Sequence, residues 1–106
     1  MGDTRIINAE QFEKEVLGGD LPAVVDFTAT WCGPCQALAP AIDELAREYD
    51  GRALVAKVDV DKEPDLAARY GVMSVPTVLF FKGGEKVDQV MGNFPDKIKK
   101  SLEALL

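Results

Sequence analysis

The chain has 106 residues, of which 47% are hydrophobic and 28% charged, and this is the size and balance of one globular domain, which we expect over residues 1–106. Its 12 lysines and arginines against 18 aspartates and glutamates give a net charge of −6, which argues against nucleic acid and anionic membranes as partners, because both need clustered cations. The lack of histidine excludes Ser-His and Cys-His nucleophile pairs, and two cysteines are too few for a closed four-cysteine zinc or iron–sulfur site.

The start of the chain predicts where the protein works. Its first five residues, Met1 to Arg5, lack the apolar core of a signal peptide. No apolar run in the sequence approaches the roughly 18 residues of a membrane span. We therefore expect a soluble, cytoplasmic protein that has no attachment to a membrane.

The first predicted elements are a short strand and a short helix. The strand candidate covers residues 5–7. Asn8 suits the N-cap of the helix that follows, because Gln11 stands three residues later in the position of a capping box. We expect the paired glycines Gly18 and Gly19 to end this helix.

A buried strand and a long amphipathic helix come next. Residues 21–29 contain a run from Ala23 to Phe27 that is apolar on both faces apart from Asp26, which is typical of a central strand covered on both sides. Pro34 suits the first turn of a helix, because its missing N–H has no partner there in any case. The apolar face of this helix follows a helical spacing at Leu38, Ile42, Leu45 and Tyr49. Gly51 then stops the helix.

The second half of the chain predicts a buried strand, a short helix, a two-stranded hairpin and a last helix. These elements cover residues 53–60, 61–70, 77–81, 86–91 and the segment from Pro95 onward. Lys57 interrupts the buried strand. Early strands that alternate with helices favour parallel crossovers, and the hairpin adds an antiparallel edge. The order therefore predicts an α/β fold, as a three-layer α/β/α sandwich.

Cys32 and Cys35 stand two residues apart where a loop meets a helix. A structural disulfide in so short a loop gains only roughly 2 kcal/mol from loop closure. Half of a shared zinc site and a pair of inert thiols are the other structural interpretations. The spacing favours a redox pair, because the helix N-terminus stabilises a thiolate at Cys32. We expect Cys32 to attack a substrate disulfide and the more buried Cys35 to resolve the mixed disulfide.

Asp26 and Lys57 place charge in the middle of strands where apolar residues are expected. Because a buried unpaired charge is costly, one interpretation is a structural ion pair, and another is that one of the two faces the surface. In the functional interpretation, Asp26 lies beneath the redox pair with its pKa raised by desolvation. It then exchanges the proton of Cys35 through a water, and Lys57 modulates it.

Trp31 and the Val75-Pro76 pair are two further candidates. Trp31 either packs in the core or shields the reactive thiol and offers contact area to a partner. Pro76 directly precedes a strand, where proline is allowed. On base rates the Val75–Pro76 bond is trans, because only about 5–6% of X–Pro bonds in folded proteins are cis.

The segment Trp31-Cys32-Gly33-Pro34-Cys35, with Asp26 before it and Val75-Pro76-Thr77 after it, resembles the thioredoxin family over essentially the whole chain. The resemblance implies the thioredoxin fold, a central five-stranded mixed sheet flanked by four helices. It also implies a cis Val75–Pro76 bond beside the two sulfurs. The docking surface that it implies is framed by Trp31, Gly33, Pro34, Val75, Pro76 and Gly92.

The resemblance further implies a protein-disulfide reductase that binds no cofactor. A thioredoxin reductase, which uses NADPH in most organisms, supplies the electrons to its Cys32–Cys35 disulfide. Ribonucleotide reductase, peroxiredoxins and methionine sulfoxide reductases are the kind of enzymes that receive them, and we expect a monomer. Two alternatives stay open: a thiol oxidase or isomerase in an oxidising compartment, and a non-redox binding subunit.

Four positions depart from the usual pattern of the family. Thr28 stands where an aromatic residue is common, and Gln36 replaces the usual Lys or Arg after the second cysteine. Ser74 precedes the Val-Pro pair where Gly or Thr often stands, and Phe94 adds an aromatic ring after Gly92. We expect Thr28 to remove packing beside the active-site loop and Gln36 to weaken the stabilisation of the thiolate slightly. Phe94 is expected to widen an apolar contact patch.

Overall fold

The computed structural model of the chain describes residues 4–106. The expected domain of residues 1–106 and the interpretation of the first five residues both include residues 1–3, which lie outside this part. Within the described part, no helix is both long enough and apolar enough to cross a membrane.

Five strands form one mixed sheet, as the resemblance implied. They are β1 (Arg5–Ile6), β2 (Ala23–Thr28), β3 (Leu54–Asp59), β4 (Thr77–Lys82) and β5 (Glu85–Met91). Their order across the sheet is β1-β3-β2-β4-β5, so β2 is the central strand. β3 runs parallel to β1 and β2, whereas β4 runs antiparallel to both β2 and β5.

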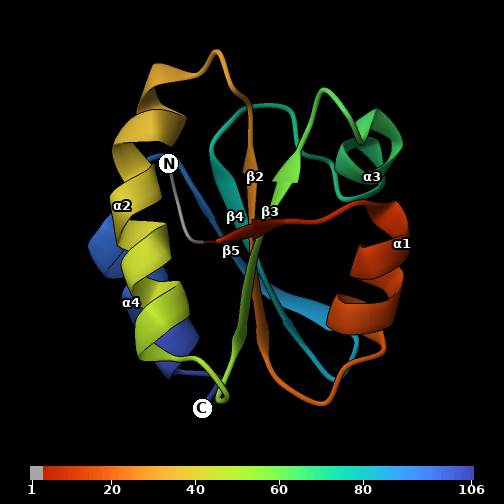
Figure 1. Cartoon of the computed structure of the whole chain (residues 1–106), viewed down its shortest axis with the longest axis vertical. Helices are drawn as coiled ribbons and strands as arrows, with labels where there is room; N and C mark the ends of the chain where they lie inside the picture. The colour runs from red at the N-terminus through yellow and green to blue at the C-terminus, as the bar shows by residue number, and fades with distance from the viewer. Residues whose placement is uncertain (1–3) are drawn as a thin grey trace.

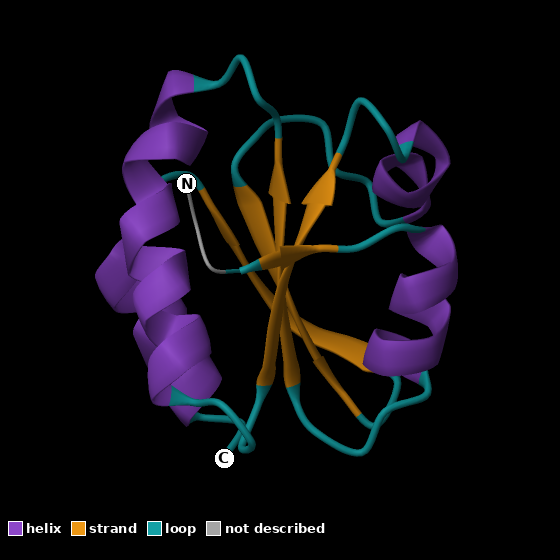
Figure 2. Cartoon of the chain, in the orientation of Figure 1, coloured by secondary structure: helices purple, strands orange, loops and turns teal. Residues whose placement is uncertain are grey.

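Helices cover both faces of this sheet. They are α1 (Ala9–Gln11), which continues directly as the π-helix η1 (Phe12–Leu17), α2 (Gly33–Glu48), α3 (Pro64–Arg69) and α4 (Pro95–Glu103). Figure 1 shows α2 and α4 together on one side of the sheet, and α1 and α3 on the other. The three layers are also plain in Figure 2. The predicted α/β/α sandwich with a five-stranded sheet and four helical segments is confirmed.

The first helix begins as the sequence predicts. Asn8 Oδ1 accepts a hydrogen bond from the backbone N–H of Gln11 at 2.8 Å, and the Gln11 side chain accepts one from the Asn8 N–H at 2.9 Å. Gly18 and Gly19 follow its end, and a Cβ at Gly19 would collide with the carbonyl oxygen of Glu15. The π-helical turns of η1 were not predicted from the sequence.

The hairpin between β4 and β5 also follows the prediction. Its two central residues, Gly83 and Gly84, have φ angles of +62° and +80°. A two-residue turn with positive φ at both positions matches the twist of the strands that it joins, and glycine adopts these angles without strain.

The core has two parts, one on each face of the sheet. Val24 of β2 and Val55 of β3 belong to the part that α2 and α4 cover. Val25 and Phe27 of β2 belong to the part that η1 and α3 cover. Because side chains alternate along a strand, Asp26 shares the face of Val24, and Lys57 shares the face of Val55. Both charged residues therefore lie on the side of the sheet that α2 covers.

Candidate active site

Cys32 and Cys35 form a disulfide at the start of α2. Cys32 is the N-cap residue and has extended backbone angles, and Cys35 lies in the first turn, with 5.2 Å between the two Cα atoms. The backbone N–H of Cys35 points at Cys32 Sγ, with 3.1 Å between nitrogen and sulfur. A free helical N–H is thus aimed at the atom that carries the negative charge when Cys32 is a thiolate, and it stabilises that charge.

Both cysteines are buried to nearly the same extent. Their exposed fractions are 4% for Cys32 and 3% for Cys35, so the expected contrast between an exposed and a buried sulfur is absent in the disulfide. Ala29 belongs to the same small cluster, and Val60 and Val75 pack against it. These neighbours cover Cys32 as well as Cys35.

The Val75–Pro76 peptide bond is cis. This agrees with the resemblance and contradicts the expectation from base rates, which average over all X–Pro bonds and ignore tertiary contacts. Tertiary contacts hold both residues of this bond. On one side, the Pro76 carbonyl accepts a hydrogen bond from the Gly92 N–H at 2.8 Å. The Val75 carbonyl oxygen lies 3.7 Å from Cys32 Sγ, so this segment touches the redox pair.

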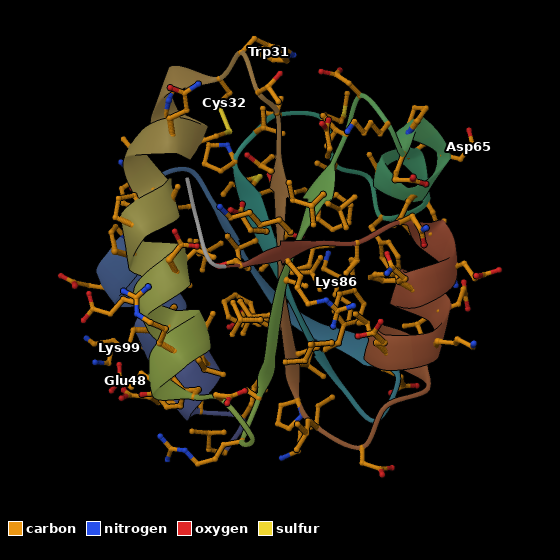
Figure 3. All side chains as sticks on the ribbon, viewed as in Figure 1. Trp31, Cys32, Glu48, Asp65, Lys86 and Lys99 are labelled. Carbon is orange, nitrogen blue, oxygen red and sulfur yellow. A yellow bond between two sulfur atoms is a disulfide. The ribbon has the colours of Figure 1, made fainter. Side chains whose placement is uncertain are left out.

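Trp31 is a surface residue and not part of the core. Its exposed fraction is 69%, and its Nε1–H donates to Asp61 Oδ2 at 2.8 Å. Figure 3 shows Trp31 and Cys32 at the end of the molecule where α2 begins. A cleft of about 130 Å³ beside them is lined by Trp31, Val60, Val72, Met73, Ser74 and Val75.

Three further docking residues were expected: Gly33 and Pro34, which begin α2, and Gly92, whose N–H donates to the Pro76 carbonyl. Gly33 and Pro34 are exposed, and a Cβ at Gly33 would meet nothing within 4 Å. Gly92 has a φ of +96°, and a Cβ there would come within 2.8 Å of the Phe94 ring. Phe94 itself is 49% exposed, with the ammonium of Lys97 4.8 Å from the centre of its ring. Phe94 thus adds one exposed aromatic ring to the apolar surface near Gly92, as expected from its departure from the usual family pattern.

Asp26 is almost completely buried, with 1% of its surface exposed. Its Oδ1 atom has no hydrogen-bond partner among the described residues. Burial raises the pKa of Asp26 to about 7, the negative charge of Asp43 adds to this increase, and the positive charge of Lys57 opposes it. The carboxyl group therefore gains and loses its proton close to neutral pH.

Lys57 pairs with a carboxylate that the sequence analysis did not single out. Its Nζ atom lies 3.9 Å from Oδ1 of Asp43, a buried residue of α2. Burial by itself favours the neutral form of Asp43. Hydrogen bonds from Thr4 and the charges of Lys57 and Arg47 outweigh this effect, and the pKa of Asp43 is lowered. The ion pair of Lys57 is therefore with Asp43 and not with Asp26, as one interpretation of the sequence would have it.

A second cleft opens beside Cys35. It measures about 410 Å³, and its lining includes Thr28, Cys35, Lys57 and Asp59. A threonine at position 28 leaves this space open where an aromatic side chain is common in the family. The cleft connects Cys35 and Lys57 with solvent and offers water a route to both. Gln36 of α2 also lines this cleft. Its Nε2 donates to the Thr30 carbonyl at 2.7 Å, which connects α2 to the loop before Trp31.

Sequence reasoning missed Asp43 and Thr4. Asp43 stands eight residues after Cys35, which is about two helical turns, so this spacing could have placed both on one side of α2. No sequence pattern pointed to Thr4. Among residues 4–106, no cluster of three His, Cys, Asp or Glu side chains is arranged to hold a metal ion.

Comparisons with known proteins agree with this geometry. The family model described as Thioredoxin matches residues 3–104. Thioredoxin 1 of Nostoc sp. is 51% identical over 84 residues, which cover 79% of this chain and 78% of that protein. Thioredoxin 2 of Chlorobaculum tepidum is 48% identical over 95 residues, covering 89% of this chain and 87% of that protein. The solved structure of the Malassezia sympodialis thioredoxin superimposes with a TM-score of 0.88 at 36% identity, covering 99% of this chain and 92% of that chain.

Proposed function

The chain belongs to the thioredoxin family, and we propose that Cys32 is its nucleophile and Cys35 its resolving thiol. As a member of this family it is a thiol-disulfide oxidoreductase that reduces protein disulfides. Its redox group is its own pair of cysteines and not a bound cofactor. The observation that carries the assignment of roles is the backbone N–H of Cys35 aimed at Cys32 Sγ at 3.1 Å.

The proposed reaction has two exchange steps. The Cys32 thiolate attacks one sulfur of a substrate disulfide, that S–S bond breaks, and the departing substrate thiolate takes up a proton. Cys35 then loses its proton, and its thiolate attacks Cys32 Sγ. The mixed disulfide between Cys32 and the substrate breaks as the Cys32–Cys35 disulfide forms, and the second substrate sulfur leaves as a thiolate and takes up a proton. Two electrons pass from the cysteine pair to the substrate.

Asp26 is our candidate for the base that takes the Cys35 proton. Its carboxyl group is buried on the face of the sheet beneath α2, and its pKa is raised to about 7 by burial. A base with a pKa near the working pH is the most effective in proton transfer. We propose that a water in the cleft beside Cys35 carries the proton between the two groups and that Lys57, which lines this cleft, modulates the transfer.

The docking surface for substrates lies around the redox pair. We propose that an extended segment of the substrate pairs with the backbone at Val75, whose carbonyl is 3.7 Å from Cys32 Sγ. The exposed ring of Trp31 supplies apolar contact area beside it. The complete proposed surface consists of Trp31, Gly33, Pro34, Val75, Pro76 and Gly92.

Thioredoxin reductase and proteins with accessible disulfides are the partners that the family implies. We propose more specifically that the reductase draws on NADPH, and that ribonucleotide reductase, peroxiredoxins and methionine sulfoxide reductases are the targets. We propose the cytoplasm as the place of action, because that compartment keeps thiols reduced. We also propose a single-domain monomer, because a dimer through the exposed Trp31 and Phe94 would cover the docking surface.

Trapping of mixed disulfides tests the assignment of roles. The Cys35→Ser protein lacks the resolving thiol and should accumulate covalent complexes with a disulfide-containing protein, visible on non-reducing gels. Cys32→Ser is the matched variant, and it should form none and have no reductase activity. Full turnover by the Cys35→Ser protein would overturn the assignment.

A further inference from the structure

Lys57 lies between two carboxyl groups and is held by one of them. On the sheet, Lys57 of β3 stands directly beside Asp26 of β2. From the layer above, Asp43 of α2 approaches its ammonium group to 3.9 Å. The exposed fractions of the Lys57 and Asp43 side chains are 12% and 10%, so their attraction is little screened by water.

The start of the chain fixes the position of Asp43. Both the backbone N–H and the hydroxyl of Thr4 donate to Asp43 Oδ1, at 3.1 Å and 2.5 Å. The same oxygen faces the Lys57 ammonium. Three contacts from two segments far apart in the sequence therefore meet at one carboxylate oxygen, and the Asp43 side chain has little freedom to move.

The neighbouring carboxyl group is in the opposite situation, because Asp26 Oδ1 has no hydrogen-bond partner among the described residues. We propose that Asp43 is a positioning residue that holds the Lys57 ammonium away from Asp26 and thereby keeps the Asp26 carboxyl able to bind a proton. This inference rests on the proposed role of Asp26 as the base for Cys35. Without Asp43, Lys57 turns to Asp26 and stabilises its carboxylate, and this makes the carboxylate a weaker base for the Cys35 proton.

Among the described residues, no other carboxylate forms an ion pair with Lys57. Cys35 and Asp59 line the cleft that reaches Lys57, and Arg47 of α2 acts on Asp43 itself. On the sheet, the neighbour of Lys57 on β1 is Ile6, and the neighbour of Asp26 on β4 is Val78. The ion pair that the structure gives Lys57 is the one with Asp43.

Asp43→Asn tests this inference, because the amide keeps an oxygen for Thr4 and removes the charge. The titration of Asp26 is followed by carboxyl ¹³C NMR in the oxidised protein, where neither cysteine titrates. We expect the midpoint to fall by about one pH unit, since removal of one negative charge and the approach of Lys57 both favour the carboxylate. An unchanged midpoint would overturn the inference. Asp43→Ser gives the same test should the Asn protein fail to fold.

Glu48→Gln is the matched control on the same helix. Glu48 pairs with Lys99 at 3.5 Å on the surface, and Figure 3 shows this pair toward the opposite end of α2 from Cys32. This variant also removes one negative charge, and we expect the Asp26 midpoint to stay where it is. An equal fall in both variants would overturn the inference, because it would reflect net charge and not the position of Lys57.

A double variant separates positioning from direct repulsion between the carboxylates. In a Lys57→Met protein, Asp43→Asn should shift the Asp26 midpoint by less than half of its effect in the original protein. An undiminished shift would show that Asp43 acts without Lys57 and would overturn the inference.

The pH dependence of reductase activity is the second readout. If the midpoint of activity follows the Asp26 midpoint in Asp43→Asn, both the inference and the base role are supported. If the NMR midpoint falls and the activity profile does not move, Asp43 still positions Lys57 and the proposed base role of Asp26 is wrong.

Discussion

Asp26 and Lys57 are direct neighbours on β2 and β3, yet the ammonium of Lys57 pairs with Asp43, and Asp26 Oδ1 has no hydrogen-bond partner among the described residues. A carboxyl group buried in this way disfavours its own ionisation. The fold thus keeps a group in its core that lowers stability at neutral pH and can exchange a proton there. This combination is typical of active sites.

The first prediction concerns stability. The pKa of Asp26 is about 7 in the folded protein and 3.8 as the reference value of an exposed aspartate. Between these two pH values the folded state binds more protons than the unfolded state. The stability that protonated Asp26 contributes is therefore fully present below pH 4 and is lost as the pH rises through 7. Asp26→Asn should therefore stabilise the protein at pH 8, by an amount on the order of 4 kcal/mol.

Urea unfolding at several pH values measures this effect. The difference in unfolding free energy between Asp26→Asn and the original protein should grow from pH 4 to pH 7 and then level off. Asp20→Asn changes an exposed aspartate outside the site and serves as the control, with a small difference at every pH. A constant difference for Asp26→Asn across this range would contradict the raised pKa.

The second prediction concerns the rate of disulfide reduction. Above pH 7 Asp26 is a carboxylate and can take the proton of Cys35, so the rate should rise as the pH passes through 7. Asp26→Asn should be slower at pH 8, by up to about 100-fold, the lower end of the usual contribution of a general base. Single-turnover kinetics with a protein disulfide measure both rates. Identical pH profiles for the two proteins would remove Asp26 from the proton transfer.

The third prediction concerns the docking surface. Trp31→Ala removes a largely exposed ring beside Cys32 and should raise the KM for protein disulfides by about ten-fold or more. The rate with a small aromatic disulfide, which needs no extended surface, should change little. Asp61→Asn keeps the ring and weakens its hydrogen bond, so we expect a smaller effect. Equal losses with both substrates would place Trp31 in the chemistry and not in docking.

The fourth prediction concerns Gly92. A side chain there meets a positive φ of +96° and the Phe94 ring at 2.8 Å, so Gly92→Ala should lower stability by roughly 1–3 kcal/mol. Gly33→Ala is the control for stability, because its Cβ enters open space. In a Phe94→Ala background the contact with the ring disappears and the backbone strain stays. Part of the loss should then be recovered, as thermal unfolding will show, and a neutral Gly92→Ala would contradict this account.

Much of the fold could be predicted because pattern and packing agree. In α2 the residues at helical spacing, such as Leu38 and Ile42, are completely buried against the sheet. The third helix was predicted to begin at residue 61, and it begins at Pro64. The side chain of Asp59 accepts a hydrogen bond from the Asp61 N–H at 2.9 Å, and this local bond holds a turn where a helix was expected.

The site was predictable where its residues are close in sequence, and less so where the fold brings them together. The spacing of Cys32 and Cys35 indicated the redox pair. The Lys57–Asp43 pair joins a strand to a helix, and no spacing rule connects residues 14 positions apart in different elements. The cis bond before Pro76 followed from the family resemblance, because local propensity favours trans.

The reduction potential of the Cys32–Cys35 pair tests the central claim, that this chain is a reductant of protein disulfides, most directly. The oxidised and reduced proteins are brought to equilibrium in glutathione buffers of graded composition, and the fraction of disulfide is measured after acid quenching. We predict a potential at or below the cytosolic glutathione range of roughly −220 to −260 mV. A potential of about −180 to −120 mV, as in oxidising catalysts, would contradict the claim and point to a thiol oxidase or isomerase.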